Sequence, residues 1–181
     1  SENFELKEGE KWYRKNIERN DDLSISHVDL CYNLMLQDRW EEALYHHNWR
    51  FNHFKQLQRF KNLDKSDKRW DGEKSLEGKT YLLYCEQGVG DVLMYSRYIP
   101  MLKKHGCKII FSCYDMLTKL LSKIEGVDEI IELKDLKVEM KAIEESDMPE
   151  HDFNSSILSL PYLLKKYEPC YEKYLDFTET V

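Results

Sequence analysis

Residues 80–91 read TYLLYCEQGVGD, and this stretch decides the fold. Its first six residues form a short continuous apolar run, which is typical of a strand buried on both faces. Residues 86–91 contain two glycines, and from Val92 to Leu102 apolar residues recur at helical spacing until Gly106, a favourable helix C-cap. The order strand, turn, helix predicts the first unit of a parallel α/β sheet.

The same alternation continues towards the C-terminus. Apolar patterns predict strands at 107–113 and 127–133 and a helix at 115–123 between them. A fourth strand is expected within 151–157, with a helix over 158–167. Residues 134–150 are expected to form a charged helical excursion. The prediction for residues 79–181 is therefore a right-handed, parallel, Rossmann-like sheet.

Residues 1–55 have a helical pattern instead. Apolar residues recur every three or four positions on both sides of Gln37-Asp38-Arg39, which predicts two antiparallel helices joined by a tight turn. The segment around Trp12, Tyr13 and Ile17 is expected to pack beside them as a third helix. Residues 56–78 are polar and highly charged apart from Trp70, so we expect a solvated linker with one aromatic anchor.

Composition and charge narrow the range of functions that the chain could have. The chain has 181 residues, 41% of them hydrophobic, and a formal net charge of −7, so a folded protein is expected and broad binding to nucleic acid or anionic membranes is disfavoured. It contains no apolar run of membrane-spanning length and no secretory leader pattern, which predicts a cytoplasmic protein. Five cysteines without a CxxC pair indicate buried, reduced thiols, including Cys107 and Cys113.

The glycine turn is the strongest candidate for chemistry. Ligands of parallel sheets collect at the carboxyl ends of strands, where the amides of a following helix are free to bind them. Gly88 and Gly90 would let a phosphate, a sugar hydroxyl or a carboxylate approach those amides. Leu93 occupies the third glycine position of the dinucleotide fingerprint, and no Walker lysine follows. NAD and ATP are therefore disfavoured, and no cofactor is expected.

Two interpretations of Asp91 stay open at this point. Its carboxylate caps the following helix, or it deprotonates a hydroxyl as a general base. Glu86 is a second candidate, although a hydrogen bond that holds the turn explains it better than catalysis. Gln87 and Arg97 are the supporting polar residues of the predicted ligand site.

A set of motifs in fixed order adds a family resemblance. The motifs are WEEAL (40–44), WRF (49–51), RWDG (69–72), LEGKT (76–80), EQGVGD (86–91), SRYIPML (96–102), GVDEII (126–131) and LSLP (158–161). Together they resemble tetratricopeptide-repeat (TPR) proteins that carry a glycosyltransferase-like domain. The Gly-x-Gly-Asp turn is also similar to that of bacterial heptosyltransferases, whose aspartate is proposed as the base, and Asp91 is the matching position.

The resemblance implies one half of a GT-B fold, the acceptor side, preceded by TPR-like helices. It implies inverting transfer from a nucleotide sugar to a sugar or glycan acceptor only if a second domain supplies the donor site. The alternative is a non-catalytic interaction module that binds protein through its helices. Inherited architecture would then explain the glycine turn.

The chain departs from the family pattern in two places. Residues 134–150 are longer than the usual connection, and only one degenerate repeat is recognisable, with Cys31, Asp38 and Arg50 at its small-residue positions. No Asp-x-Asp motif follows a strand, so no metal site is expected. His46, His47 and His53 lack partners at ligand spacing and are expected to face solvent or stack on aromatic rings.

Overall fold

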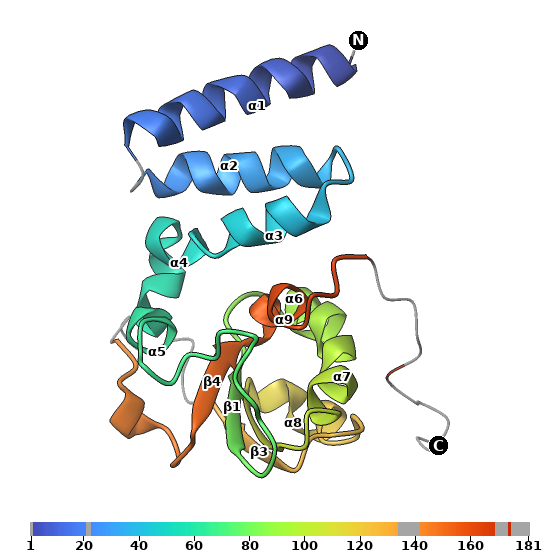
Figure 1. Ribbon diagram of the computed structural model, residues 1–181. Helices are drawn as coiled ribbons and strands as arrows, with labels where there is room; N and C mark the ends of the chain where they lie inside the picture. The colour runs from blue at the N-terminus through green and yellow to red at the C-terminus, as the bar shows by residue number, and fades with distance from the viewer. Residues whose placement is uncertain (1, 21–22, 134–141, 169–173, 175–181) are drawn as a thin grey trace.

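A computed structural model describes residues 2–20, 23–133, 142–168 and 174. Its N-terminal part is a stack of helices, and its C-terminal part is an α/β unit built on four strands (Figure 1).

The N-terminal helices form the predicted hairpin with a third helix beside it. These are α1 (Glu2–Arg19), α2 (Ser24–Met35) and α3 (Trp40–His47). Asp38 turns the chain between α2 and α3 in the left-handed conformation, with φ 57°, which aspartate tolerates better than most residues. The three helices share a small core, into which α1 contributes Tyr13 and Ile17 but not the exposed Trp12.

The stretch after α3 differs from the prediction. The single helix expected to reach Phe54 is divided into α3 and α4 (Arg50–His53). Residues 56–78, expected to be a solvated linker, begin with η1 (Lys55–Phe60) and α5 (Lys61–Asp64). Five apolar side chains of that stretch are fully buried in the main core: Leu57, Phe60, Leu63, Trp70 and Leu76. The first three are spaced three residues apart, which places them on one helical face among charged neighbours.

The sheet is entirely parallel, in the order β3-β2-β1-β4. Its strands are β1 (Thr80–Tyr84), β2 (Lys108–Cys113), β3 (Glu129–Glu132) and β4 (Phe153–Ser156). Tyr81 pairs with Ile109 on one side and with Phe153 on the other, so β1 is a central strand. The apolar run that predicted β1 is buried from Tyr81 to Cys85, because β1 lies between two other strands and both faces of the sheet are covered there.

Short helices follow each of the first two strands. After β1 come α6 (Val89–Tyr95), η2 (Ser96–Tyr98) and α7 (Ile99–Lys103), and after β2 comes α8 (Asp115–Leu121). The predicted excursion at 134–150 lies outside the described residues up to 141 and then forms only η3 (Glu145–Asp147). The chain after β4 forms η4 (Ile157–Ser159) and α9 (Leu160–Leu163), a shorter helix than predicted.

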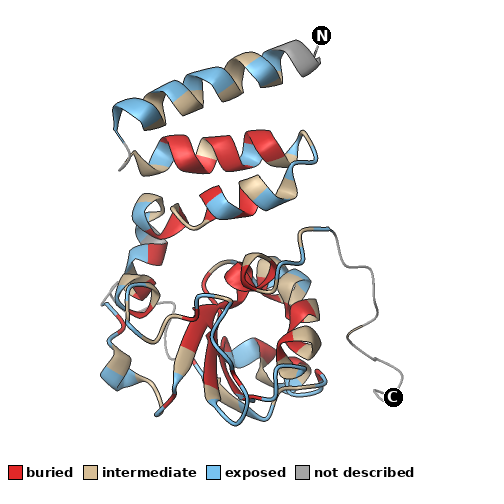
Figure 2. Cartoon of the chain, in the orientation of Figure 1, coloured by how far each residue is buried: buried red, intermediate tan, exposed pale blue. Residues whose placement is uncertain are grey.

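Buried residues are concentrated in the strands and on the inner sides of the helices (Figure 2). α7 and α8 lie to one side of the sheet and α5 lies to the other (Figure 1). The main core includes side chains of α5, α7 and α8 together with those of the strands. Phe60 of η1 also belongs to it and stacks on Tyr84 of β1 with ring centroids 5.4 Å apart. Among the described residues, no helix has both the length and the apolarity needed to cross a membrane.

Candidate functional site

The glycine turn lies at the carboxyl end of the central strand β1. Gly88 is the N-cap of α6, and Gly88, Val89 and Gly90 are all exposed. A Cβ built on Gly90 would meet no atom within 4 Å. The turn therefore has open space on its outer side, and its first-turn amides are accessible to a ligand.

Asp91 is the third residue of α6 and is half-buried. The N-cap of α6 is Gly88, so Asp91 is not the N-cap that one interpretation predicted and lies instead in the first turn of the helix. A Cβ on Gly88 would lie 3.3 Å from Asp91 Oδ2, which shows that the carboxylate leans back over the turn. Within the described part of the chain, this carboxylate accepts no hydrogen bond. It is free to accept a proton or a hydrogen bond from a bound molecule.

Glu86 occupies the other side of the turn and is enclosed. Its side chain and that of Arg50 are both 0% exposed, and they form an ion pair at the junction of α4 with the sheet. Arg50 donates from Nε and Nη2 to Glu86 Oε1, at 3.0 and 2.5 Å, and Ser156 donates its hydroxyl to the same oxygen. Burial raises the pKa of Glu86, and the Arg50 guanidinium opposes that shift. This geometry is that of a residue that holds the turn.

Gln87 fixes the turn to the neighbouring strand. Its carbonyl oxygen accepts a hydrogen bond of 2.5 Å from the Tyr114 hydroxyl, at the carboxyl end of β2. Its side chain is half-buried beside the exposed glycines. The backbone of the turn is thus held on both sides while its outer surface stays open.

Arg97 lies away from the turn. It comes six residues after Asp91, which is about 9 Å along a helix axis. Its Nε donates to the Met94 carbonyl oxygen at 2.8 Å, and its guanidinium lies 5.1 Å from the centre of the Tyr174 ring. The structure therefore brings together Glu86, Gln87, Gly88, Gly90 and Asp91 but places Arg97 in η2, beyond the end of α6.

Two tyrosines that the sequence pattern did not single out interact electrostatically with Asp91. Burial raises the pKa of Tyr95 to about 12, and the Asp91 charge adds to that shift. Burial likewise raises the pKa of Tyr32, on α2, with a further contribution from Asp91. Tyr32 belongs to a helix that the sequence assigns to another segment, so no local pattern could have linked it to the turn.

Exposed apolar side chains border the carboxyl edge of the sheet. Val89 is 36% exposed at the start of α6, and Met116 is 70% exposed at the start of α8. Helices α6 and α8 follow the adjacent strands β1 and β2, so the two side chains lie at the same edge. A second domain that closed over this edge would cover both side chains.

Histidine and cysteine side chains are mostly enclosed rather than gathered into a site. His46 and His47 are buried, contrary to the expected solvent-facing position, although His46 does lie against the Trp49 ring. Cys107 and Cys113 are buried free thiols, as predicted. In the part of the chain that the structure describes, no three histidine, cysteine, aspartate or glutamate side chains are grouped so that they could hold a metal ion.

Comparisons with known proteins add no identity to this geometry. No protein-family model matches the chain, and no curated protein and no solved structure shows significant similarity to it.

Proposed function

We propose that the α/β unit is the acceptor-side half of a GT-B, glycosyltransferase-like protein whose N-terminal helices are TPR-like. In this proposal Asp91 is the general base that takes a proton from an acceptor hydroxyl, and the amides near Gly88 and Gly90 orient that acceptor. A second domain supplies the nucleotide-sugar donor. The half is not competent for transfer by itself.

One observation carries this proposal. Asp91 is half-buried, and its carboxylate accepts no hydrogen bond from a described residue, beside a turn whose outer side is open. A general base needs an acceptor-facing oxygen of this kind. The exposed Val89 and Met116 add support, because a closing donor domain would cover the edge that they occupy.

The test is a transfer assay on the intact protein encoded by this reading frame. Nucleoside diphosphate release is measured with a panel of nucleotide sugars and glycan acceptors, for the wild type and for Asp91→Asn. We expect Asp91→Asn to lower turnover about 100-fold or more, since it removes the base but keeps the shape. Its unfolding free energy should change by less than about 1 kcal/mol, the usual value of a charge in a first helical turn.

Asp115→Asn is the matched control. Asp115 begins α8 at the neighbouring strand, and its carboxylate accepts a hydrogen bond from the Met116 amide. This variant removes the same charge from the same edge and should keep turnover within about twofold of the wild type. Equal turnover in Asp91→Asn and wild type would eliminate Asp91 as the base.

A second candidate is a non-catalytic interaction module. The enclosed Glu86 favours it, because the polar side chain closest to the turn holds Arg50 and not a ligand. Amide resonances separate the two candidates. Sugars or nucleotide sugars that shift the Gly88 and Gly90 resonances support the acceptor site, whereas unchanged resonances support the interaction module.

A further inference from the structure

A second concave surface lies between α3 and the chain that follows α9, away from Asp91. It is a groove of about 660 Å³, which we call the acid–aromatic groove. Tyr45 and Tyr162 bring their rings to 6.3 Å across it, and Tyr45 is 47% exposed. Aromatic rings, carboxylates and one arginine line the groove.

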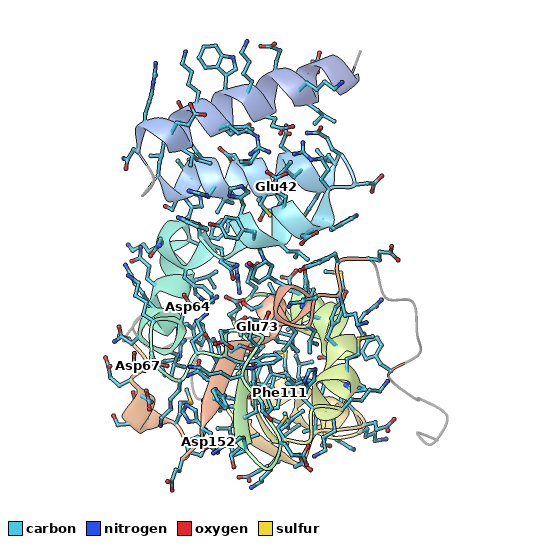
Figure 3. The ribbon with its side chains drawn as sticks, viewed as in Figure 1. Glu42, Asp64, Asp67, Glu73, Phe111 and Asp152 are labelled. Carbon is cyan, nitrogen blue, oxygen red and sulfur yellow. The ribbon has the colours of Figure 1, made fainter. Side chains whose placement is uncertain are left out.

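The groove carries excess negative charge. It has four carboxylates and one guanidinium, that of Arg39. Arg39 donates to Glu42 at 2.5 Å and to both carboxylate oxygens of Glu10 at 2.8 and 2.7 Å, so its charge is already satisfied. Figure 3 labels Glu42, on α3. No ion pair with a described residue neutralises the other three carboxylates, Asp38, Glu41 and Glu168.

Helix-start preferences explain only part of this composition. Glu41 and Glu42 lie in the first turn of α3, where carboxylates stabilise the helix dipole. Glu168, Tyr162 and Tyr167 come from α9 and the chain beyond it, and the dipole of α3 does not account for them. Aromatic faces combined with carboxylates form an environment that favours an organic cation.

A smaller apolar cavity adjoins the groove. It has a volume of about 160 Å³ and shares Trp40 and Tyr167 with the groove. Leu44, Met94 and Pro161 supply apolar lining, and Arg97 and Lys166 stand at its border. Those two cations would repel a basic group there. The two cavities therefore suit a ligand that places a cationic group in the acid–aromatic groove and an apolar group in the smaller cavity.

We propose that the acid–aromatic groove binds a basic segment of a partner protein in extended conformation. An arginine or lysine side chain would lie between the tyrosine rings and the carboxylates that form no ion pair, of which Glu41 also accepts a hydrogen bond from Tyr167. An apolar side chain two positions away would enter the smaller cavity. Side chains two apart on an extended chain point to the same face, about 7 Å from one another, which suits two adjoining cavities. This proposal does not depend on the role of Asp91.

Charge argues against two other occupants. A second copy of this chain carries a net charge of −7 and would be repelled. The chain's own residues 169–181 include three acidic residues and one lysine, which also makes them a poor match for an acidic groove. A basic partner segment carries the positive charge that both of these occupants lack.

The probe is a fluorescein-labelled peptide pool with arginine and leucine fixed two positions apart and glycine, serine and alanine mixed elsewhere. Binding is followed by fluorescence anisotropy. Replacing arginine with neutral citrulline should weaken binding about tenfold, as loss of an ion pair and a cation–π contact would. Replacing leucine with serine should also weaken it, by several-fold.

The protein variants test the location. Glu41→Gln with Glu168→Gln removes two exposed carboxylates of the groove and should weaken binding about tenfold. The matched control is Glu125→Gln with Glu150→Gln, which removes the same charge from exposed residues near the amino ends of β3 and β4. The control should bind as the wild type does. Far-UV circular dichroism of both double variants checks that they are folded.

Three outcomes would overturn the proposal. The first is no saturable binding of the pool up to about 1 mM, a contact too weak to be specific. The second is equal weakening by the control pair, which would assign the effect to overall charge. The third is binding of arginine amide as tight as that of the pool, which would make the groove a small-cation site instead of a peptide site.

Discussion

The pair Arg50 and Glu86 is the residue-scale feature that joins the two parts of the chain. Arg50 also donates from Nη1 to the His47 carbonyl oxygen at 3.1 Å and from Nη2 to the Ser159 hydroxyl at 2.9 Å. Its donors thus reach α3, the end of β1 and the chain after β4. Removing both partners of a buried ion pair costs less stability than removing one, because the single charge that remains is buried without an opposite charge.

Arg50→Met should therefore lower the unfolding free energy by about 3–5 kcal/mol, measured by urea denaturation. The double variant Arg50→Met with Glu86→Leu should recover much of that loss, because it removes the uncompensated carboxylate. Lys108→Met is the control, since its pair with Glu129 is half-exposed and is worth less than about 1 kcal/mol. A double variant less stable than Arg50→Met would contradict this account.

At the scale of elements, a histidine pair joins α2 to α3. His27 Nδ1 and His46 Nδ1 are 2.7 Å apart and buried, and the Trp49 ring stacks on His27 at 3.8 Å. A short contact between two imidazole nitrogens needs at least one of them unprotonated. Burial and the neighbouring His27 lower the pKa of His46 from 6.5 to about 4, with Glu42 opposing that shift and Arg14 adding to it.

The stability of the α2–α3 hairpin should consequently fall as the pH falls from about 6.5 to about 4. In that range the unfolded chain takes up a proton at His46 and the folded chain does not, and each pKa unit is worth about 1.4 kcal/mol. Thermal unfolding across this range is the measurement. His46→Gln should reduce this dependence without abolishing it, because burial also lowers the pKa of His47, and His53→Gln on α4 is the matched control.

A separate effect, that of the Glu10 carboxylate, can be distinguished from the histidine effect by its pH window. Glu10 accepts hydrogen bonds from Arg14, Arg39 and Gln37, and these hold its pKa at about 2, against 4.5 for an ordinary glutamate. Its stabilisation is present above pH 4.5 and is lost as the pH falls towards 2. An unchanged slope between pH 6.5 and 4.5 in His46→Gln would refute the role of the histidine pair.

At the scale of the whole molecule, residues 56–78 belong to the core of the α/β unit. Five of their apolar side chains are buried there, each worth about 1.5–3 kcal/mol, against a typical total stability of about 5–15 kcal/mol. A fragment of residues 79–181 should therefore show no cooperative urea transition by far-UV circular dichroism.

A fragment of residues 50–181 is the matched comparison. It keeps Arg50 as the partner of Glu86 and all five buried side chains, so it should unfold cooperatively. Cooperative unfolding of both fragments would show that residues 56–78 are dispensable. Failure of both would show that the α/β unit also needs α1, α2 and α3.

Patterns within a few residues were sufficient to predict much of this fold. The apolar run of β1 and the glycines after it predicted the strand, the exposed turn and the helix α6, because those features depend on neighbours along the chain. The break at Asp38 likewise predicted the α2–α3 hairpin. Leu57, Phe60 and Leu63 were missed because charged residues between them hid a helical spacing.

The sequence by itself determined the helical hairpin, the parallel α/β alternation and the place of the glycine turn, since local backbone preferences and apolar spacing specify each of them. Only the tertiary structure decided that Glu86 is enclosed by Arg50, 36 residues away, and that α3 and the chain after α9 form an acidic groove. Contacts between distant segments depend on how whole elements pack, and residue spacing carries no information about that packing.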